Sequence, residues 1–186
     1  MALKKGARIL AIDDSYFRKS DKDALIVGVV GRENEIEGIL SFRVSVDGSD
    51  ATEKIIRKVR ASKFSDQIRL VVLHGISLAG LNIVDVIKVS KDLRMPVVNV
   101  VRKKPQGKEL EKALKASNVR EFSKRIAKLR KLNGKLNLWK ADGFYYQSIG
   151  LDKKEIVAFG QSMVRLLRLA HLIANGIARG ESKGRI

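Results

Sequence analysis

Short apolar runs alternate along the chain with stretches in which apolar residues recur at helical spacing. Four of these runs predict strands: residues 7–12, 24–30, 68–73 and 96–101, of which the first is typical of a strand covered on both faces. Residues 36–46 follow a different pattern, because apolar side chains occupy every second position from Leu40 to Val46. A period of two with one apolar side predicts a half-buried antiparallel strand. The chain therefore opens with three strands in a meander.

Helical spacing separates the later strands. Ile55, Ile56 and Val59 form one stripe in a helix predicted over residues 51–62, and a second helix is expected at about residues 81–93. Ser49 or Asp50 is placed to cap the first helix. A meander followed by alternating strands and helices is the order of a ribonuclease H-like α/β fold. We expect one domain over residues 1–186, with a mixed five- to six-stranded sheet flanked by helices.

The last third of the chain changes in composition. Residues 102–140 hold fourteen Lys or Arg and three acids, with apolar residues at helical spacing, which predicts a basic amphipathic helix or a pair of helices. Two short strands, residues 136–138 and 144–149, follow around an Asp142-Gly143 turn. Asp152 is placed to cap a closing helix that runs to about residue 178. Residues 180–186 are expected to form a flexible basic tail.

The net charge changes the functional picture. Lys and Arg number 38 against 20 Asp and Glu, a formal charge of +18, which favours an anionic partner such as nucleic acid. Cysteine is absent, which excludes disulfides, cysteine nucleophiles and zinc fingers.

The sequence lacks an apolar run of about 20 residues, so we expect a cytoplasmic protein without membrane contact. The apolar closing helix, residues 156–177, offers a surface for a homodimer.

Candidate chemistry begins with Asp13 and Asp14 at the end of the first strand. Carboxylates at a strand end can hold Mg²⁺ or Mn²⁺, with Asp47 or Asp50 as further metal ligands. A capping role in the turn is the alternative for Asp47 and Asp50. His74 ends an apolar strand, where it is either a catalytic residue or a hydrogen-bonded structural one. His171 and Asp85 are interpreted as a core or interface residue and a surface residue, respectively.

Several motifs resemble those of known nucleases. The strand followed by Asp13-x-Ser15-Tyr16, and the segment Gly38-Ile-Leu-Ser-Phe-Arg43, resemble endonuclease V. The match is closer to an archaeal family, domain of unknown function ninety-nine, a distant relative of endonuclease V. Its marks are residues 46–52, 75–85, 101–105, 169–173 and 180–182. The resemblance implies a ribonuclease H-like fold, with Tyr16, Arg43 and Arg102 as nucleic-acid contacts. Lys103 and Lys104, at the start of the basic stretch, are further candidate contacts.

The same resemblance implies a changed catalytic centre. Endonuclease V cleaves near inosine with Mg²⁺ held by acids, and Asp13 matches the first of these. A later Glu of that family falls on Val44, an Asp falls on His74, and a late His falls on Leu151. The strand-separating wedge falls on residues 34–37, which are acidic. A neutral His ligates Mn²⁺ or a softer metal but removes a negative charge that Mg²⁺ needs.

Three functions remain open from the sequence. The first is a nucleic-acid-binding protein on an endonuclease V-like scaffold with a degraded catalytic centre. The second is an active Mg²⁺- or Mn²⁺-dependent endonuclease that uses Asp13 and a rearranged set of acids. The third is a protein-interaction or small-ligand module without a nucleic-acid role. Binding with a shallow salt dependence would favour the third.

Overall fold

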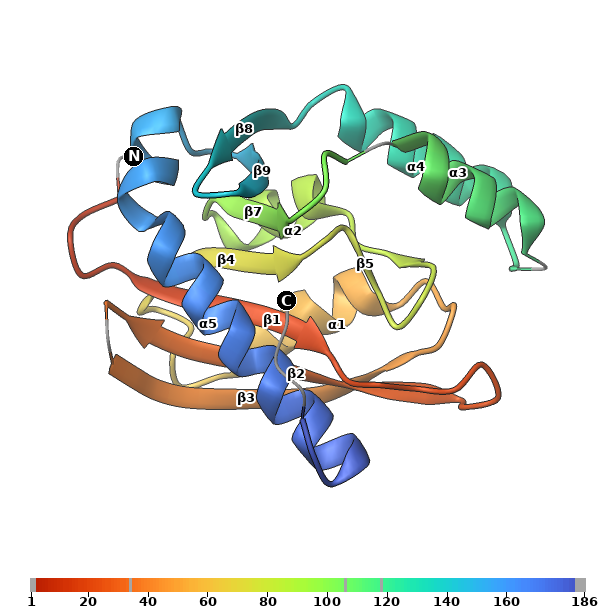
Figure 1. The fold of residues 1–186 in the computed structure, drawn as a ribbon, viewed down its shortest axis with the longest axis horizontal. Coiled ribbons are helices and arrows are strands. Elements are labelled where there is room, and N and C mark those ends of the chain that lie inside the picture. Colours follow the sequence, from red (N-terminus) through yellow and green to blue (C-terminus); the bar gives the residue numbers. More distant parts are fainter. Residues whose placement is uncertain (1–2, 34, 106, 118, 183–186) are drawn as a thin grey trace.

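The computed structural model describes residues 3–33, 35–105, 107–117 and 119–182 (Figure 1). Residues 183–186 of the predicted tail lie outside the described residues. Strands and helices follow in the order β1 (Arg8–Asp14), β2 (Asp23–Arg32), β3 (Glu35–Ser45), α1 (Ala51–Arg60), β4 (Ile68–His74), β5 (Ser77–Leu78), β6 (Asn82–Ile83), α2 (Val86–Leu93), β7 (Val97–Val101), α3 (Gly107–Ala116), α4 (Phe122–Asn133), β8 (Asn137–Ala141), β9 (Phe144–Ile149) and α5 (Lys153–Arg179).

The main sheet has the strand order β3-β2-β1-β4-β7-β9-β8. Strands β1, β4 and β7 are parallel, and the other pairs are antiparallel. This arrangement, with the opening meander beside a parallel half-sheet, confirms the predicted ribonuclease H-like α/β fold. The sheet has seven strands, more than the predicted five to six, because the β8–β9 hairpin pairs with the outer edge of β7.

Helices cover both faces of the sheet. Helix α5 lies across one face, where Leu166, Leu167 and Ala170 pack on the side chains of β1, β2 and β4. Helices α1 and α2 cover the other face. Within the described part of the chain, α5 is long and apolar enough to cross a membrane, a property that the core helix of a globular protein also has. Its N-terminal capping box, formed by Asp152 and Glu155, confirms the predicted cap.

Two local predictions were wrong. The helix expected over residues 81–93 begins at Val86, because the residues before it form the β5–β6 hairpin and Asp85 caps α2 through the amide of Lys88. Asp85 is therefore a capping residue. The Asp50 side chain does not cap α1; instead, the first amide of that helix, on Ala51, donates to Asn82 Oδ1 at 3.1 Å.

Candidate metal centre

Strand register brings Asp13 and His74 together. Ile12 of β1 pairs with Leu73 of β4, and these strands are parallel, so the next residue of each strand lies at the same edge of the sheet. Residues two apart on a strand share a face. Asp13 thus continues the line of Ile9 and Ala11, which face α5. His74 Nδ1 lies 3.3 Å from Asp13 Oδ2.

Helix α5 supplies a third side chain to the same point. His171 Nδ1 lies 2.9 Å from Asp13 Oδ2, and the two imidazole rings meet edge to face with centroids 6.4 Å apart. One donor atom each from Asp13, His74 and His171 lies within 4.8 Å of the other two. Asp13 is 1% exposed, whereas the side chains of His74 and His171 are 29% and 24% exposed. The group therefore opens to solvent through its imidazoles.

The charges of this group depend on one another. Burial alone raises the pKa of Asp13, but the hydrogen bonds with His171 and His74 outweigh burial and lower that pKa. An ionised carboxylate can only accept, so His171 Nδ1 donates the hydrogen bond. The same bond raises the pKa of His171. Asp13 is accordingly a charged carboxylate held between two imidazoles.

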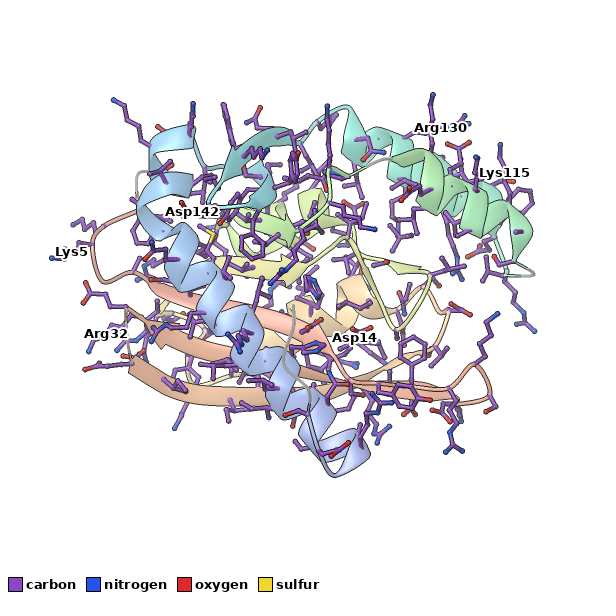
Figure 2. The ribbon with its side chains drawn as sticks, viewed as in Figure 1. Lys5, Asp14, Arg32, Lys115, Arg130 and Asp142 are labelled. Atoms are coloured by element: carbon purple, nitrogen blue, oxygen red, sulfur yellow. The ribbon has the colours of Figure 1, made fainter. Side chains whose placement is uncertain are left out.

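Asp14 lies beside this group but is not part of it. Its Oδ2 accepts a hydrogen bond from the amide of Ala79 at 2.6 Å, which ties the end of β1 to the loop after His74. Burial, followed by repulsion from Asp13, raises the pKa of Asp14 to about 6. Figure 2 shows Asp14 at the carboxyl end of the parallel strands. The structure thus gives this predicted catalytic residue a role in holding the loop.

The predicted metal ligands Asp47 and Asp50 hold backbone instead. Asp47 Oδ1 accepts from the amide of Leu81 at 2.8 Å. The carboxylate of Asp50 accepts from the amide of Ser45 and from Asn82 Nδ2, the latter at 2.7 Å. Among the described residues, the group of donors suited to a metal does not include either acid. Their contacts correspond to the structural alternative, in which both acids stabilise the turn between β3 and α1.

Tyr16 and Arg43 lie close to the centre. The amide of Tyr16 donates to Asn175 Oδ1 at 3.0 Å, and Asn175 lies one helical turn beyond His171. The ring of Tyr16 is 46% exposed, and the guanidinium of Arg179 lies 4.2 Å from its centroid. Arg43, on β3, forms an ion pair with Asp23 and lines the same cavity of about 490 Å³ as Tyr16.

The other predicted nucleic-acid contacts follow β7. His74 pairs with Val100 in the β4–β7 ladder, so Arg102, Lys103 and Lys104 come at the edge of the sheet that carries the centre. All three are exposed. The guanidinium of Arg102 lies 5.4 Å from the centroid of the Phe144 ring, which leaves its positive charge at the surface.

His171 is the residue that sequence reasoning missed, since its side chain is 24% exposed and contacts Asp13 and is not part of the apolar core. The signal was polar spacing: His171, Asn175 and Arg179 recur every four residues on the last turns of α5. This row lies beside the buried residues Ala170 and Ala174. A polar row along a helix that is otherwise apolar indicates contact with a site.

The donor chemistry fits a divalent transition-metal ion. Two imidazole nitrogens and one carboxylate suit Mn²⁺, Fe²⁺, Co²⁺ or Zn²⁺, whereas Mg²⁺ prefers oxygen ligands throughout. Asp13 brings the negative charge, and the partial exposure of the two imidazoles leaves one side of the group open to solvent. The residues present therefore fit a metal ion of the borderline class better than Mg²⁺.

Comparisons with known proteins identify the family. A family model described as Endonuclease dU matches residues 5–178. The UPF0215 proteins of Thermococcus sibiricus and Methanothermobacter thermautotrophicus are 38% and 37% identical, over 97% and 98% of this chain and 97% and 93% of theirs. A crystal structure of a protein of unknown function from Archaeoglobus fulgidus superposes with a TM-score of 0.77 at 32% identity, over 91% of this chain and 97% of that one.

Endonuclease V from Ciona intestinalis, in complex with DNA that contains inosine, gives a TM-score of 0.45 at 14% identity, over 78% of this chain and 72% of that one. The family match rests instead on the model that spans almost the whole chain and on relatives above 30% identity over nearly their full length. The archaeal family indicated by the sequence motifs is confirmed, and the chain belongs to the endonuclease dU family.

Proposed function

We propose that this chain is a divalent-metal-dependent endonuclease that cuts DNA at deoxyuridine. The observation that carries the proposal is the convergence of Asp13, His74 and His171 at the open end of the parallel strands. Open α/β sheets place their sites at such strand ends. The family description, Endonuclease dU, agrees with an endonuclease that acts at deoxyuridine, and the charge of +18 suits a polyanion.

In this proposal the three side chains have different roles in binding the ion. Asp13 supplies the negative charge, and its position is fixed by β1 and by the hydrogen bond from His171. His74 and His171 supply nitrogen ligands from β4 and α5, two elements that pack on β1. A divalent ion bound there would polarise a phosphoryl oxygen as a Lewis acid. This function assigns His74 to metal binding, which replaces the acid expected from the resemblance to endonuclease V.

The surroundings of the centre suit a nucleic-acid strand. Tyr16 offers an exposed ring beside Arg179, and such a pair can stack with a base. Arg102, Lys103 and Lys104 offer exposed positive charge at the same sheet edge. Phosphate contacts position a strand without reading its sequence. These groups would place a phosphodiester beside the donors, while the cavity lined by Tyr16 and Arg43 would take a nucleotide.

A second candidate is a binding protein whose cleavage is lost. One observation favours it, because the position of the second acid of endonuclease V falls on Val44, which is fully buried. The centre then has one carboxylate where two-metal nucleases use several. The same assay separates this candidate from the first.

The decisive experiment is a cleavage assay on labelled duplex and single-stranded DNA that carries one deoxyuridine, one deoxyinosine or neither. Reactions contain Mg²⁺, Mn²⁺, Co²⁺ or Zn²⁺. The variants are Asp13→Asn, His74→Gln and His171→Gln, with Asp92→Asn as a control because Asp92 is a solvent-side acid paired with Lys88. We expect cutting at deoxyuridine in Mn²⁺ or Co²⁺ that falls at least about 100-fold in each of the three variants and is unchanged in the control.

Three other results would contradict the proposal. A gel shift with no cutting in any of the four ions would favour the binding protein. Cutting that survives Asp13→Asn would place the chemistry elsewhere in the chain. Binding that is weak and insensitive to salt would favour a module without a nucleic-acid role.

A further inference from the structure

Helices α3 and α4 form a hairpin that projects from the sheet at the end of the molecule that carries the candidate centre (Figure 1). One side of this hairpin is apolar. Leu114, Ile126 and Leu129 are buried there, and they pack with Ile76 and Leu81 of the loop that follows His74. The hairpin therefore covers the loop beside the centre, and Leu132 near the end of α4 joins the core on the α1–α2 face of the sheet.

The other side of each helix carries lysines at the same spacing. Residues at i, i+4 and i+7 lie on one side of a helix. Lys108, Lys112 and Lys115 follow this spacing on α3, opposite the buried Leu114. On α4 the same spacing holds Lys124, Lys128 and Lys131. Four residues of helix rise about 6 Å, so each row presents charges at regular steps.

Most of this charge is uncompensated. Residues 107–133 contain nine Lys or Arg and three acids. Glu111 forms ion pairs with Lys115 and Arg130, both labelled on the hairpin in Figure 2, and Glu121 pairs with Lys124. Within the described residues, Lys108, Lys112 and Lys131 are exposed and form no ion pair. Like charges at i, i+4 destabilise a helix by about 0.2–0.5 kcal/mol per pair, so helix stability does not explain the pattern.

A buried arginine fixes the hairpin to the site. Arg125 is 6% exposed, and its Nη1 donates to the carbonyl oxygens of Asp47 at 2.7 Å and Leu81 at 3.0 Å. Asp47 in turn accepts from the amide of Leu81, and the same loop holds Asp14 through Ala79. The loop after His74 is thus a common anchor for the hairpin and for the end of β1. Lys103 and Lys104 precede α3, so exposed charge continues from the sheet edge onto the hairpin.

We propose that the α3–α4 hairpin is an arm that binds the phosphate backbone of duplex DNA, independently of base sequence, and holds it across the metal centre. This inference rests on the proposed function, because the strand held by the arm is the one cut at the centre. The lysine rows suit backbone contact. The exposed aromatic residue on the hairpin is Phe122, at the start of α4, so base stacking contributes little and a duplex is favoured over a single strand. The apolar side is covered by the loop, which removes the face that a membrane would need.

The test compares two triple variants of the full chain. The arm variant is Lys108→Gln, Lys112→Gln and Lys131→Gln. The control is Lys91→Gln, Lys153→Gln and Lys154→Gln, which removes the same charge from exposed positions on α2 and at the start of α5, away from His171. Binding to a duplex of random sequence is measured by fluorescence anisotropy between 50 and 300 mM salt, with circular dichroism to confirm that each variant is folded.

We expect the slope of log K against log salt to become less negative by about 2.7 in the arm variant, since each phosphate contact contributes about 0.9. Affinity should fall about tenfold or more, and KM should rise with it while kcat changes less than twofold. In the control variant, the slope should change by less than about 1. An unchanged slope in the arm variant, or equal losses in both variants, would overturn the arm. Stronger binding to anionic vesicles than to duplex would overturn it as well.

The binding assay also separates this inference from the proposed function. Asp13→Asn should abolish cutting and keep the wild-type slope. If the wild-type chain binds duplex through the arm but cuts no substrate, the proposed function fails and the arm stands. If the chain cuts and the arm variant binds like wild type, the arm fails and the proposed function stands.

Discussion

Asp13 is a buried carboxylate that contacts two imidazoles. An unpaired carboxylate in that position would be costly, and His171 and His74 reduce the cost through their contacts with its Oδ2. Lysine or arginine would do the same but could not bind a metal ion through a free lone pair. Histidine can serve both states, because its neutral ring is a metal ligand and its charged ring is an ion-pair partner. The same three residues can therefore be stable without an ion and bind one.

Tyr146 is a buried tyrosine whose hydroxyl lowers the stability of the folded chain. Its hydroxyl is buried and has no hydrogen-bond partner among the described residues, and burial, with a smaller contribution from Asp142, raises its pKa to about 12. We expect Tyr146→Phe to increase the free energy of unfolding at pH 8 by about 1 kcal/mol, since an unpartnered polar atom is removed.

The pH dependence of this difference has a definite sign. Between pH 10 and 12 the folded chain keeps the Tyr146 proton that the unfolded chain releases, so this residue lowers stability as the pH rises above 10. The difference in the free energy of unfolding between Tyr146→Phe and wild type should therefore increase by up to about 1 kcal/mol from pH 8 to pH 11, as measured by urea unfolding. A difference that decreases over this range would contradict the assignment.

At the scale of elements, the loop from His74 to α2 organises the site. It contacts β1 through Asp14, the turn after β3 through Asp47, and α4 through Arg125. Its path depends on Gly80, which has a φ of +85°, and a Cβ there would collide with the Asp47 carboxylate. Glycine tolerates this backbone conformation because it has no Cβ.

Substitution of two glycines tests this role. We expect Gly80→Ala to lower the free energy of unfolding by about 1–3 kcal/mol, through backbone strain and the displaced Asp47. Gly176→Ala is the matched control, because a Cβ at Gly176 in α5 meets nothing within 4 Å. Alanine there should raise stability by about 0.5–1 kcal/mol, since glycine is a poor helix former. Equal effects of the two substitutions in urea unfolding would refute the role of the loop.

At the scale of the molecule, the centre joins elements from distant parts of the chain. Strand β1, strand β4 and helix α5 each contribute one donor, so an ion bound there would cross-link the sheet and the helix on its face. An ion that binds the folded chain and not the unfolded one stabilises the whole domain. Metal binding should therefore be visible in global unfolding.

The thermal midpoint gives this prediction a number. With Mn²⁺ at 100 times its Kd, the chain should gain about 2.7 kcal/mol, which corresponds to a rise in Tm of about 5–10 °C for a domain of this size. Mg²⁺ should give a smaller rise. His171→Gln should remove most of the Mn²⁺-induced shift, and Asp92→Asn should keep it. A shift of the same size in His171→Gln, measured by calorimetry with and without the ion, would exclude His171 as a ligand.

Much of the fold was determined by the sequence itself. The apolar runs and the alternation in β3 located the main strands, because their periods reflect which faces are covered. Asp152 and the Asp142-Gly143 turn set the boundaries of α5 and the β8–β9 hairpin through local backbone chemistry. Asp13 at the end of an apolar run and the motifs shared with endonuclease V led to the family. These features depend on residues close together in the chain.

The membership of the candidate metal centre depends on the tertiary structure. His171 lies 158 residues from Asp13, and its helical neighbours are apolar, so the local pattern indicated a core or interface residue. Asp47 and Asp50 had the composition of metal ligands, but the long-range contacts of Leu81 and Asn82 occupy their oxygens. Secondary structure follows from neighbouring residues, whereas a site depends on which strands pair and which helix crosses them. That packing brings one carboxylate and two imidazoles to the same point.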